Sequence, residues 1–254
     1  MKRIFSTLLV IVLAFAMLPV SSVMAADPSP VTTNVVVTPS TVLLNGQATV
    51  TATITYTDLT STKAADFSLD NGTTWSPMDA VNGAFDELTE AVTKTFTATS
   101  KTVTQVCVRG TELMPLATEP TLGTSVCTPL SVFVFKGFKP PVRMNVANKA
   151  NAGQAIPLKW QLLNAKNKPV KDKAFFVGVM SYQVDCTSLA GVTSPVVENG
   201  PGKSGLKFTG GYWHFNWKTP KAYAGTCRKM FVSFAGGQMS PEVLFVFKDV
   251  KPKK

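Results

Sequence analysis

Residues 49–57 read Thr-Val-Thr-Ala-Thr-Ile-Thr-Tyr-Thr, and this stretch decides the fold class. Polar and apolar residues alternate throughout, which is the period of a β-strand with one face on a core and the other in water. Most of its residues are β-branched or aromatic, the types that favour strands. We therefore predict a half-buried strand in which Val50, Ala52, Ile54 and Tyr56 face a core and five threonines face solvent.

Other short strands are predicted around this one, at residues 35–37, 93–97 and 105–109, and Pro39 and Gly46 mark a turn. No stretch after the N-terminal segment shows a helical period of apolar residues. Several short strands separated by turn residues are typical of an antiparallel β-sandwich.

The second half of the chain repeats the pattern. Residues 156–162 and 213–217 alternate apolar and polar residues, and the continuous apolar run at 174–179 suits a central strand. Residues 132–136 (Val-Phe-Val-Phe-Lys) and 244–248 (Leu-Phe-Val-Phe-Lys) indicate that each half ends on a similar final strand. The sequence thus predicts an all-β protein made of two tandem Ig-like antiparallel β-sandwich domains.

A proline-rich stretch separates the two halves. Residues 136–142 read Lys-Gly-Phe-Lys-Pro-Pro-Val, and tandem prolines favour an extended and fairly stiff connection. We expect an N-terminal Ig-like domain at 26–136 and a C-terminal domain at 137–254 that ends in a basic tail.

The N-terminal 25 residues have the pattern of a cleaved signal peptide. A basic start, Met1-Lys2-Arg3, precedes an apolar run at 4–20, and small residues follow at a cleavage site after Ala25. No later apolar stretch approaches the roughly 20 residues that a membrane span needs. The sequence predicts a secreted protein, either extracellular or held at a cell surface.

Export changes the interpretation of the four cysteines. In an oxidising compartment an even number of cysteines favours disulfides over metal or redox chemistry. The economical pairing is one bridge per domain, Cys107 with Cys127 and Cys186 with Cys227. If the valines beside Cys107 face the core, the first bridge clamps two strands on the outer face and is not a buried bridge between sheets.

The second half resembles the PxKF domain of exported bacterial proteins over residues 137–248. The resemblance lies in Ile-Pro-Leu-Lys-Trp at 156–160, Asp-Cys at 185–186 and Trp-Lys-Thr-Pro-Lys-Ala-Tyr-Ala-Gly-Thr-Cys-Arg at 217–228. Trp160 stands where the motif has phenylalanine. The family occurs as a terminal module without an established activity, so the resemblance implies an exported β-domain and assigns no catalytic residue.

The first half resembles the bacterial Ig-like repeats of exported proteins at residues 67–75, 86–92 and 106–111. Residues 68–75 also fit the Asp-box pattern Ser-x-Asp-x-Gly-x-Thr-Trp, which is a hairpin element of sialidases remote from their active site. A single copy does not indicate a sialidase. We expect Asp70 to shape a turn with Trp75 packed beneath it.

The charges are divided between the two halves. Residues 26–135 carry four basic and ten acidic residues, a net charge of −6, whereas residues 136–254 carry 19 basic and five acidic residues, a net charge of +14. A strongly basic exported domain with surface aromatic residues suits acidic polymers such as cell-wall polymers, acidic polysaccharides or DNA. If the two alternating strands are neighbours, their outward residues form one ligand-binding patch: Lys159, Gln161, Tyr212, His214, Asn216 and Lys218.

Catalytic and metal chemistry find little support in the sequence. His214 is the single histidine, and a general base needs an orienting partner that the sequence does not identify. Asp70, Asp86 and Glu87 are weak calcium candidates, because their spacing lacks the known calcium loop. We expect no cofactor and no catalytic residue.

The sequence therefore predicts a non-enzymatic exported protein with a structural or binding role, whose basic C-terminal domain binds polyanionic or carbohydrate polymers. One alternative is a small secreted hydrolase that uses His214. The other is a self-associating surface or adhesion subunit, because the opposite charges of the two domains permit head-to-tail contact between copies.

Overall fold

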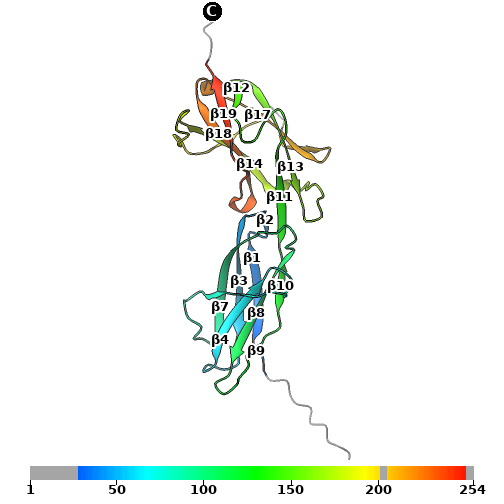
Figure 1. Cartoon of the computed structure of the whole chain (residues 1–254), viewed down its shortest axis with the longest axis vertical. Coiled ribbons are helices and arrows are strands. Elements are labelled where there is room, and N and C mark those ends of the chain that lie inside the picture. The colour runs from blue at the N-terminus through cyan, green and yellow to red at the C-terminus, as the bar shows by residue number, and fades with distance from the viewer. Residues whose placement is uncertain (1–27, 201–204, 250–254) are drawn as a thin grey trace, which may run out of the picture.

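A computed structural model describes residues 28–200 and 205–249 of the chain. The predicted signal peptide and residues 250–254 of the basic tail lie outside these residues. The described part is all-β, with three short 3-10 turns and no α-helix: η1 Lys173–Phe175, η2 Lys221–Tyr223 and η3 Ala235–Gly237. Its strands form two Ig-like β-sandwiches arranged end to end (Figure 1). No helix in the described ranges has the length and apolar character needed to cross a membrane.

Two sheets make up the N-terminal sandwich. The first has the order β1 (Val31–Thr38), β3 (Gln47–Thr55), β7 (Thr89–Thr97), β6 (Asp79–Ala80). The second has the order β10 (Val126–Pro129), β8 (Gln105–Leu113), β4 (Thr62–Ser68), β5 (Ser76–Pro77), and β9 (Thr121–Leu122) also pairs with β8. Four predicted core residues, Val50, Ala52 and Ile54 of β3 and Tyr56 just after it, are all buried between these sheets, as the alternation predicted.

The C-terminal sandwich is built in the same way. One sheet has the order β16 (Lys207–Thr209), β17 (Tyr212–Lys218), β13 (Ala155–Leu163), β11 (Ser131–Phe138), β2 (Thr41–Leu43). The other has the order β12 (Asn148–Asn151), β19 (Val243–Lys248), β18 (Cys227–Phe234), β14 (Phe176–Val184), β15 (Val196–Glu198). Trp160 and Trp217 are fully buried between the sheets. The strand expected at 174–179 starts later, because residues 173–175 form the turn η1.

Strand β11 belongs to both domains, which differs from the predicted linker starting at Lys136. Its first residues pair in parallel with β2, and Val132 lies in the N-terminal core. Its later residues pair with β13, and Phe138 lies in the C-terminal core. The stretch 132–136 therefore does not simply close the first domain, because the same strand continues into the second.

Both predicted disulfides are present, Cys107–Cys127 and Cys186–Cys227. Cys107 and Cys127 face each other across β8 and β10, so the first bridge is the predicted clamp between adjacent strands. Cys127 is exposed, but Cys107 is only 1% exposed, which corrects the expectation of an open outer face. Cys107 is covered because Ser68 of β4 and Cys127 of β10 flank it on both sides.

The two domains also touch away from β11. The Gln238 side chain, beside η3, accepts a hydrogen bond from the Leu43 amide and donates one to the Gln47 carbonyl, both at 3.4 Å. On another loop, Lys101 Nζ donates to Asn167 Oδ1 at 2.6 Å. The junction is therefore a set of contacts from both domains.

Candidate functional site

Strand pairing brings the predicted patch together on the outer face of the β13–β17 pair. The strands are antiparallel neighbours, and Trp160 of β13 lies opposite Trp213 of β17 on the inner face. Alternate residues of a strand face opposite sides of the sheet, so the residues next to these tryptophans along each strand point outward. The register sets outward residues opposite one another: Lys159 with His214, Pro157 with Asn216 and Ala155 with Lys218.

Two of the outward side chains are held by specific contacts. Lys159 Nζ lies 4.3 Å from the centre of the Tyr212 ring, a cation–π contact that leaves the ammonium near the surface. Gln161 Nε2 donates to the Gly211 carbonyl at 3.1 Å. Gln161 thus supports the β16–β17 turn, and the exposed charge of the patch comes from its lysines.

The sequence prediction missed two further lysines on this face. Lys207 lies directly opposite His214 across β16 and β17. The Lys139 amide donates to the Lys159 carbonyl at 2.8 Å, and Lys139 follows the inward-facing Phe138. Gly210-Gly211 between short strands is a hairpin signal that predicts β16 and hence Lys207. Nothing local pointed to Lys139, because its neighbour Lys159 is 20 residues away.

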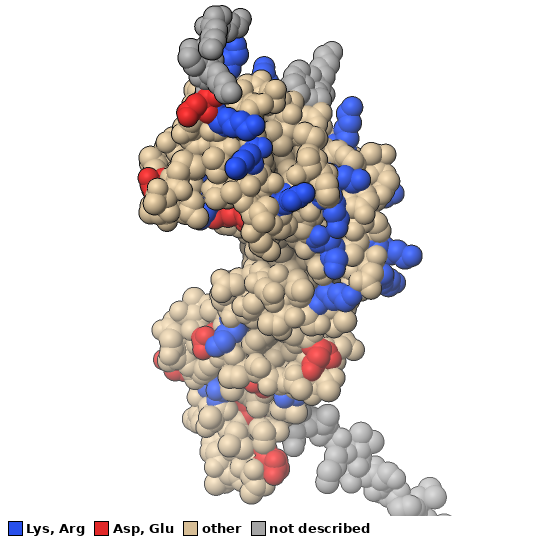
Figure 2. All heavy atoms as spheres, turned by 45° about the horizontal axis from the view of Figure 1, so that its top comes forward, with Lys and Arg blue, Asp and Glu red and all other residues tan. Residues whose placement is uncertain are grey.

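Carboxylates of the C-terminal domain are engaged elsewhere. Glu198 is buried, and Glu242 forms an ion pair with Lys229 at 3.2 Å on the other sheet. Asp172 and Asp185 accept hydrogen bonds from the backbone of their own loops. Within residues 28–200 and 205–249, Lys139, Lys159, Lys207 and Lys218 form no ion pair. Figure 2 shows lysine and arginine gathered along one side of the C-terminal domain, with few acidic residues among them.

A groove of about 570 Å³ adjoins this face. Ala155 and Pro157, on the outer face of β13, form part of its wall, and the segment 141–151 forms the opposite side. The Asn148 side chain holds that segment in place, because its Oδ1 accepts from the Arg143 amide and its Nδ2 donates to the Arg143 carbonyl, both at 2.9 Å. Three exposed cationic side chains also line the groove: Arg143, Lys149 and Lys248.

His214 is not placed as a general base. Its cross-strand neighbours are Lys159 on one side and Lys207 on the other. A lysine ammonium only donates hydrogen bonds, so neither neighbour can orient the imidazole as the carboxylate of a catalytic triad does. The arrangement makes His214 part of a basic surface, and the hydrolase hypothesis gains no support from it.

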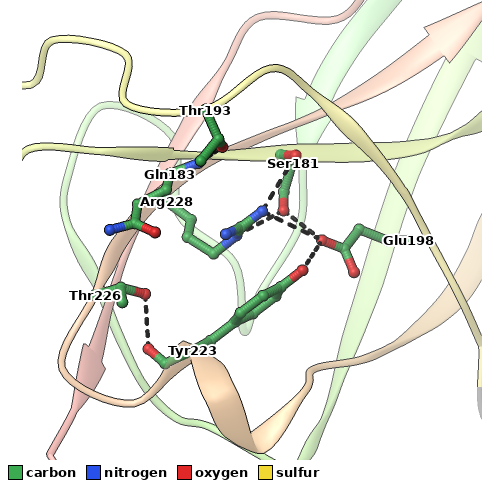
Figure 3. A network of polar contacts seen from close by, with 7 residues as sticks. All are labelled: Ser181, Gln183, Thr193, Glu198, Tyr223, Thr226 and Arg228. Atoms are coloured by element: carbon green, nitrogen blue, oxygen red, sulfur yellow. Dashed lines mark hydrogen bonds and ion pairs between the residues drawn. The ribbon is translucent and has the colours of Figure 1, made fainter.

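A buried polar network lies at one end of the C-terminal core (Figure 3). Ser181 donates to Glu198 Oε1, and the Tyr223 hydroxyl donates to the same oxygen at 2.9 Å. Arg228 Nε donates to Ser181 Oγ at 2.9 Å, and its guanidinium lies 3.8 Å from the centre of the Tyr223 ring. Burial, the hydrogen bond to Glu198 and the charge of Glu198 raise the pKa of Tyr223.

This network explains the chemistry of the 217–228 stretch in structural terms. Tyr223 and Arg228 belong to that stretch, and Thr226 Oγ1 adds a hydrogen bond to the Tyr223 carbonyl at 2.7 Å. Ser181 and Arg228 are 0% and 5% exposed, so substrate in solution cannot reach them without unfolding. We interpret the network as structural, because paired and hydrogen-bonded groups are the form in which charge is tolerated in a core.

The Asp-box stretch is a turn, as predicted. Asp70 Oδ1 accepts from the amides of Thr73 and Thr74 at 3.0 and 2.8 Å, and Trp75 Nε1 donates to the Gly72 carbonyl at 3.0 Å. Hydrogen bonds, the largest from the Thr74 side chain, lower the pKa of Asp70 to about 2. The carboxylate is thus occupied by its own turn.

The weak calcium candidates Asp70, Asp86 and Glu87 find no support. Across the described ranges no three His, Cys, Asp or Glu side chains come close enough to hold a metal ion. Asp86 and Glu87 are exposed on a loop of the N-terminal domain, away from the Asp70 turn.

No protein-family model matches the chain, and no curated protein matches it. Among solved structures, the chain is similar to the N-terminal eight Ig domains of Down Syndrome Cell Adhesion Molecule, at 10% identity over 88% of this chain and 25% of that one, with a TM-score of 0.33. It is also similar to extracellular domains 3–5 of Drosophila OTK, at 11% identity over 82% and 58%, with a TM-score of 0.30.

A third similar structure is the cycloalternan-forming enzyme from Listeria monocytogenes in complex with pentasaccharide substrate, at 7% identity over 81% of this chain and 18% of that one, with a TM-score of 0.26. The chain spans only part of each of these proteins. Because all three TM-scores are low, no functional argument rests on them, and the fold rests on the strand pairing itself.

Proposed function

We propose that this protein is an exported, non-enzymatic binding protein whose C-terminal domain binds polyanionic polymers. The observation that carries the proposal is the outer face of β11, β13, β17 and β16. Lys139, Lys159, Lys207 and Lys218 gather there beside Tyr212 and His214, without a partner carboxylate among the described residues. Clustered cations on one face attract a polyanion because each contact releases bound counterions.

Export is supported by chemistry as well as by the N-terminal pattern. Both pairs of cysteines form disulfides, which persist in oxidising compartments.

We also propose that residues 137–248 form a PxKF domain. Trp160 fills the core at the motif's aromatic position, and Tyr223 and Arg228 of the second motif stretch form the buried network.

A binding assay on heparin, a wall polymer and DNA tests the function. The double variant Lys159→Gln/Lys207→Gln should bind all three more weakly, and the slope of log affinity against log salt should fall by about two, because about one counterion is released per lysine contact. The matched control is Lys94→Gln/Lys229→Gln, which removes the same charge from lysines paired with Asp79 and Glu242 elsewhere.

The control variant should keep at least most of the affinity and the salt slope of the unmodified chain. Equal losses in the two variants would show that net charge, and not this face, governs binding. Absence of retention on all three polymers at low salt would overturn the proposal.

A further inference from the structure

The end of the N-terminal domain remote from the C-terminal domain exposes leucines on three loops. Leu59, Leu88 and Leu116 are 64%, 41% and 98% exposed. Hydrogen bonds join these loops at their bases. The Tyr56 amide, just before the Leu59 loop, donates to the Leu88 carbonyl at 2.8 Å. Glu112, just before the 114–120 loop, accepts from the amides of Thr57 and Asp58 in the Leu59 loop. These leucines therefore belong to one built surface, which we call the tip.

The tip is acidic. Asp86 and Glu87 are exposed on the Leu88 loop, and Glu119 is exposed on the Leu116 loop. Residues 57–61, 81–88 and 114–120 contain no lysine or arginine. Lys63, just after the Leu59 loop, is buried and donates to the Leu59 carbonyl at 2.9 Å, so its charge is not exposed at the tip. Exposed leucines beside carboxylates, with no exposed cation among them, suit an apolar partner surface with a basic rim.

The groove of the C-terminal domain has the complementary character. Val142, Val146 and Ile156 give it apolar walls, and Val146 is half exposed. Arg143, Lys149 and Lys248 line it with positive charge. β12 and β19, which flank the groove, lie at the C-terminal end of the molecule, whereas β9 and the start of β4 lie at the tip end (Figure 1).

We propose that the tip of one copy docks in the groove of a second copy of this chain. The acidic tip attracts the basic groove. The basic C-terminal domain of another copy would instead be repelled by the groove, because both carry positive charge. Because tip and groove differ and lie at opposite ends, each contact leaves a free tip and a free groove, and the assembly grows as an open head-to-tail chain. Because opposite charges contribute to the contact, raised salt should weaken it.

Sedimentation velocity over a range of protein concentrations tests this proposal. The unmodified chain should sediment faster as its concentration rises at low salt, and raised salt should reverse the effect. Leu116→Asp on the tip and Val146→Asp in the groove should each remain monomeric. Both side chains are exposed, so neither substitution removes a core contact.

Mixing the two variants gives the sharpest outcome. Leu116→Asp retains its groove and Val146→Asp retains its tip, so an equal mixture should form dimers and stop there. Val177→Asp is the matched control, because Val177 is 62% exposed on β14, two strands away from β19, and does not line the groove. This control should associate like the unmodified chain.

Three results would overturn the proposal: an unmodified chain that stays monomeric at low salt, a mixture of the two variants that stays monomeric, or a control that loses association. Association does not rest on polyanion binding. Lys159→Gln/Lys207→Gln should assemble normally, so the two proposals fail independently.

Discussion

At the residue scale, buried charge in this protein is held by dense hydrogen bonding. Glu112 is fully buried and accepts from the amides of Thr57 and Asp58, and from Thr57 Oγ1 and Ser61 Oγ at 2.7 and 2.6 Å. Burial works to raise its pKa, but the hydrogen bonds from Ser61, Thr57 and Asp58 together lower it below the ordinary value. Glu112 is thus a structural carboxylate that fixes the loop bearing Leu59.

The lowered pKa of Glu112 makes the N-terminal domain sensitive to acid. A carboxylate with a lowered folded-state pKa stabilises the fold above its ordinary pKa near 4.5, and this contribution is lost as the pH falls through the folded value. Glu112→Gln should lower the free energy of unfolding by about 2 kcal/mol at neutral pH and flatten its decline below about pH 4.5. Denaturation at several pH values, monitored by hydrogen exchange of β3 and β8, measures the loss of unfolding free energy and its pH dependence.

Exposed Glu119 provides the comparison for this prediction. Glu119→Gln should leave the free energy of unfolding at neutral pH nearly unchanged. Asp58 and Asp70, whose pKa values are also lowered, titrate in every variant, so the difference between curves isolates Glu112. A Glu112→Gln curve parallel to that of the unmodified chain would contradict the argument.

At the element scale, strand β11 shows how a local irregularity serves two cores. Phe135 lies opposite Leu162 and Phe138 opposite Trp160, so three steps along β11 match two along β13. The extra residue is a β-bulge, and it lets both phenylalanines face inward despite their odd spacing. Gly137 sits in this bulge with φ of 76°, in the left-handed region that glycine adopts without strain.

Gly137→Ala should lower the free energy of unfolding of the C-terminal domain by about 1–2 kcal/mol through backbone strain. An added Cβ there lies 3.6 Å from Met144, an ordinary contact, so no clash contributes. Gly178→Ala is the control, because Gly178 lacks a positive φ and its added Cβ would lie 3.7 Å from Val197. Thermal unfolding of both variants checks this, and an equal loss in the two would exclude strain at the bulge.

At the scale of the whole molecule, the junction is more than a tether. β11 pairs with β2 on one side and with β13 on the other. In addition, η3 of the C-terminal domain lies against Pro39 of the N-terminal domain. A Cβ added at Gly236 of η3 would lie 2.5 Å from the proline ring. The junction fixes the angle between the tip on one domain and the groove on the other. That angle sets the direction in which a head-to-tail assembly grows.

Gly236→Ala should therefore push η3 off Pro39 and broaden the range of angles between the domains. Gly237 is a matched control, because its φ of 72° is close to the 70° of Gly236 but nothing lies within 4 Å of its added Cβ. Small-angle X-ray scattering and NMR relaxation of each domain measure the angular range. Identical behaviour of Gly236→Ala and Gly237→Ala would show that the contact with Pro39 does not orient the domains.

Much of the fold and part of the site could be predicted from the sequence. Alternation in residues 49–57 and 156–162 identified the buried faces, because the two-residue period of a strand is local. The cysteine pairing followed from one bridge per domain. The patch around Lys159 and His214 was predicted only on the condition that two strands are neighbours, which the chain pattern does not decide.

What the sequence determined by itself was therefore the strand class, the inward and outward faces, the opposite charges of the two halves and the pairing of cysteines. Each depends on residues near one another in the chain or on simple counts. The tertiary structure alone decided that Lys139 and Lys207 join the basic face, that β11 serves both cores and that exposed leucines from three loops meet at one tip. These features depend on strand register and loop convergence across long separations, which local propensity does not encode.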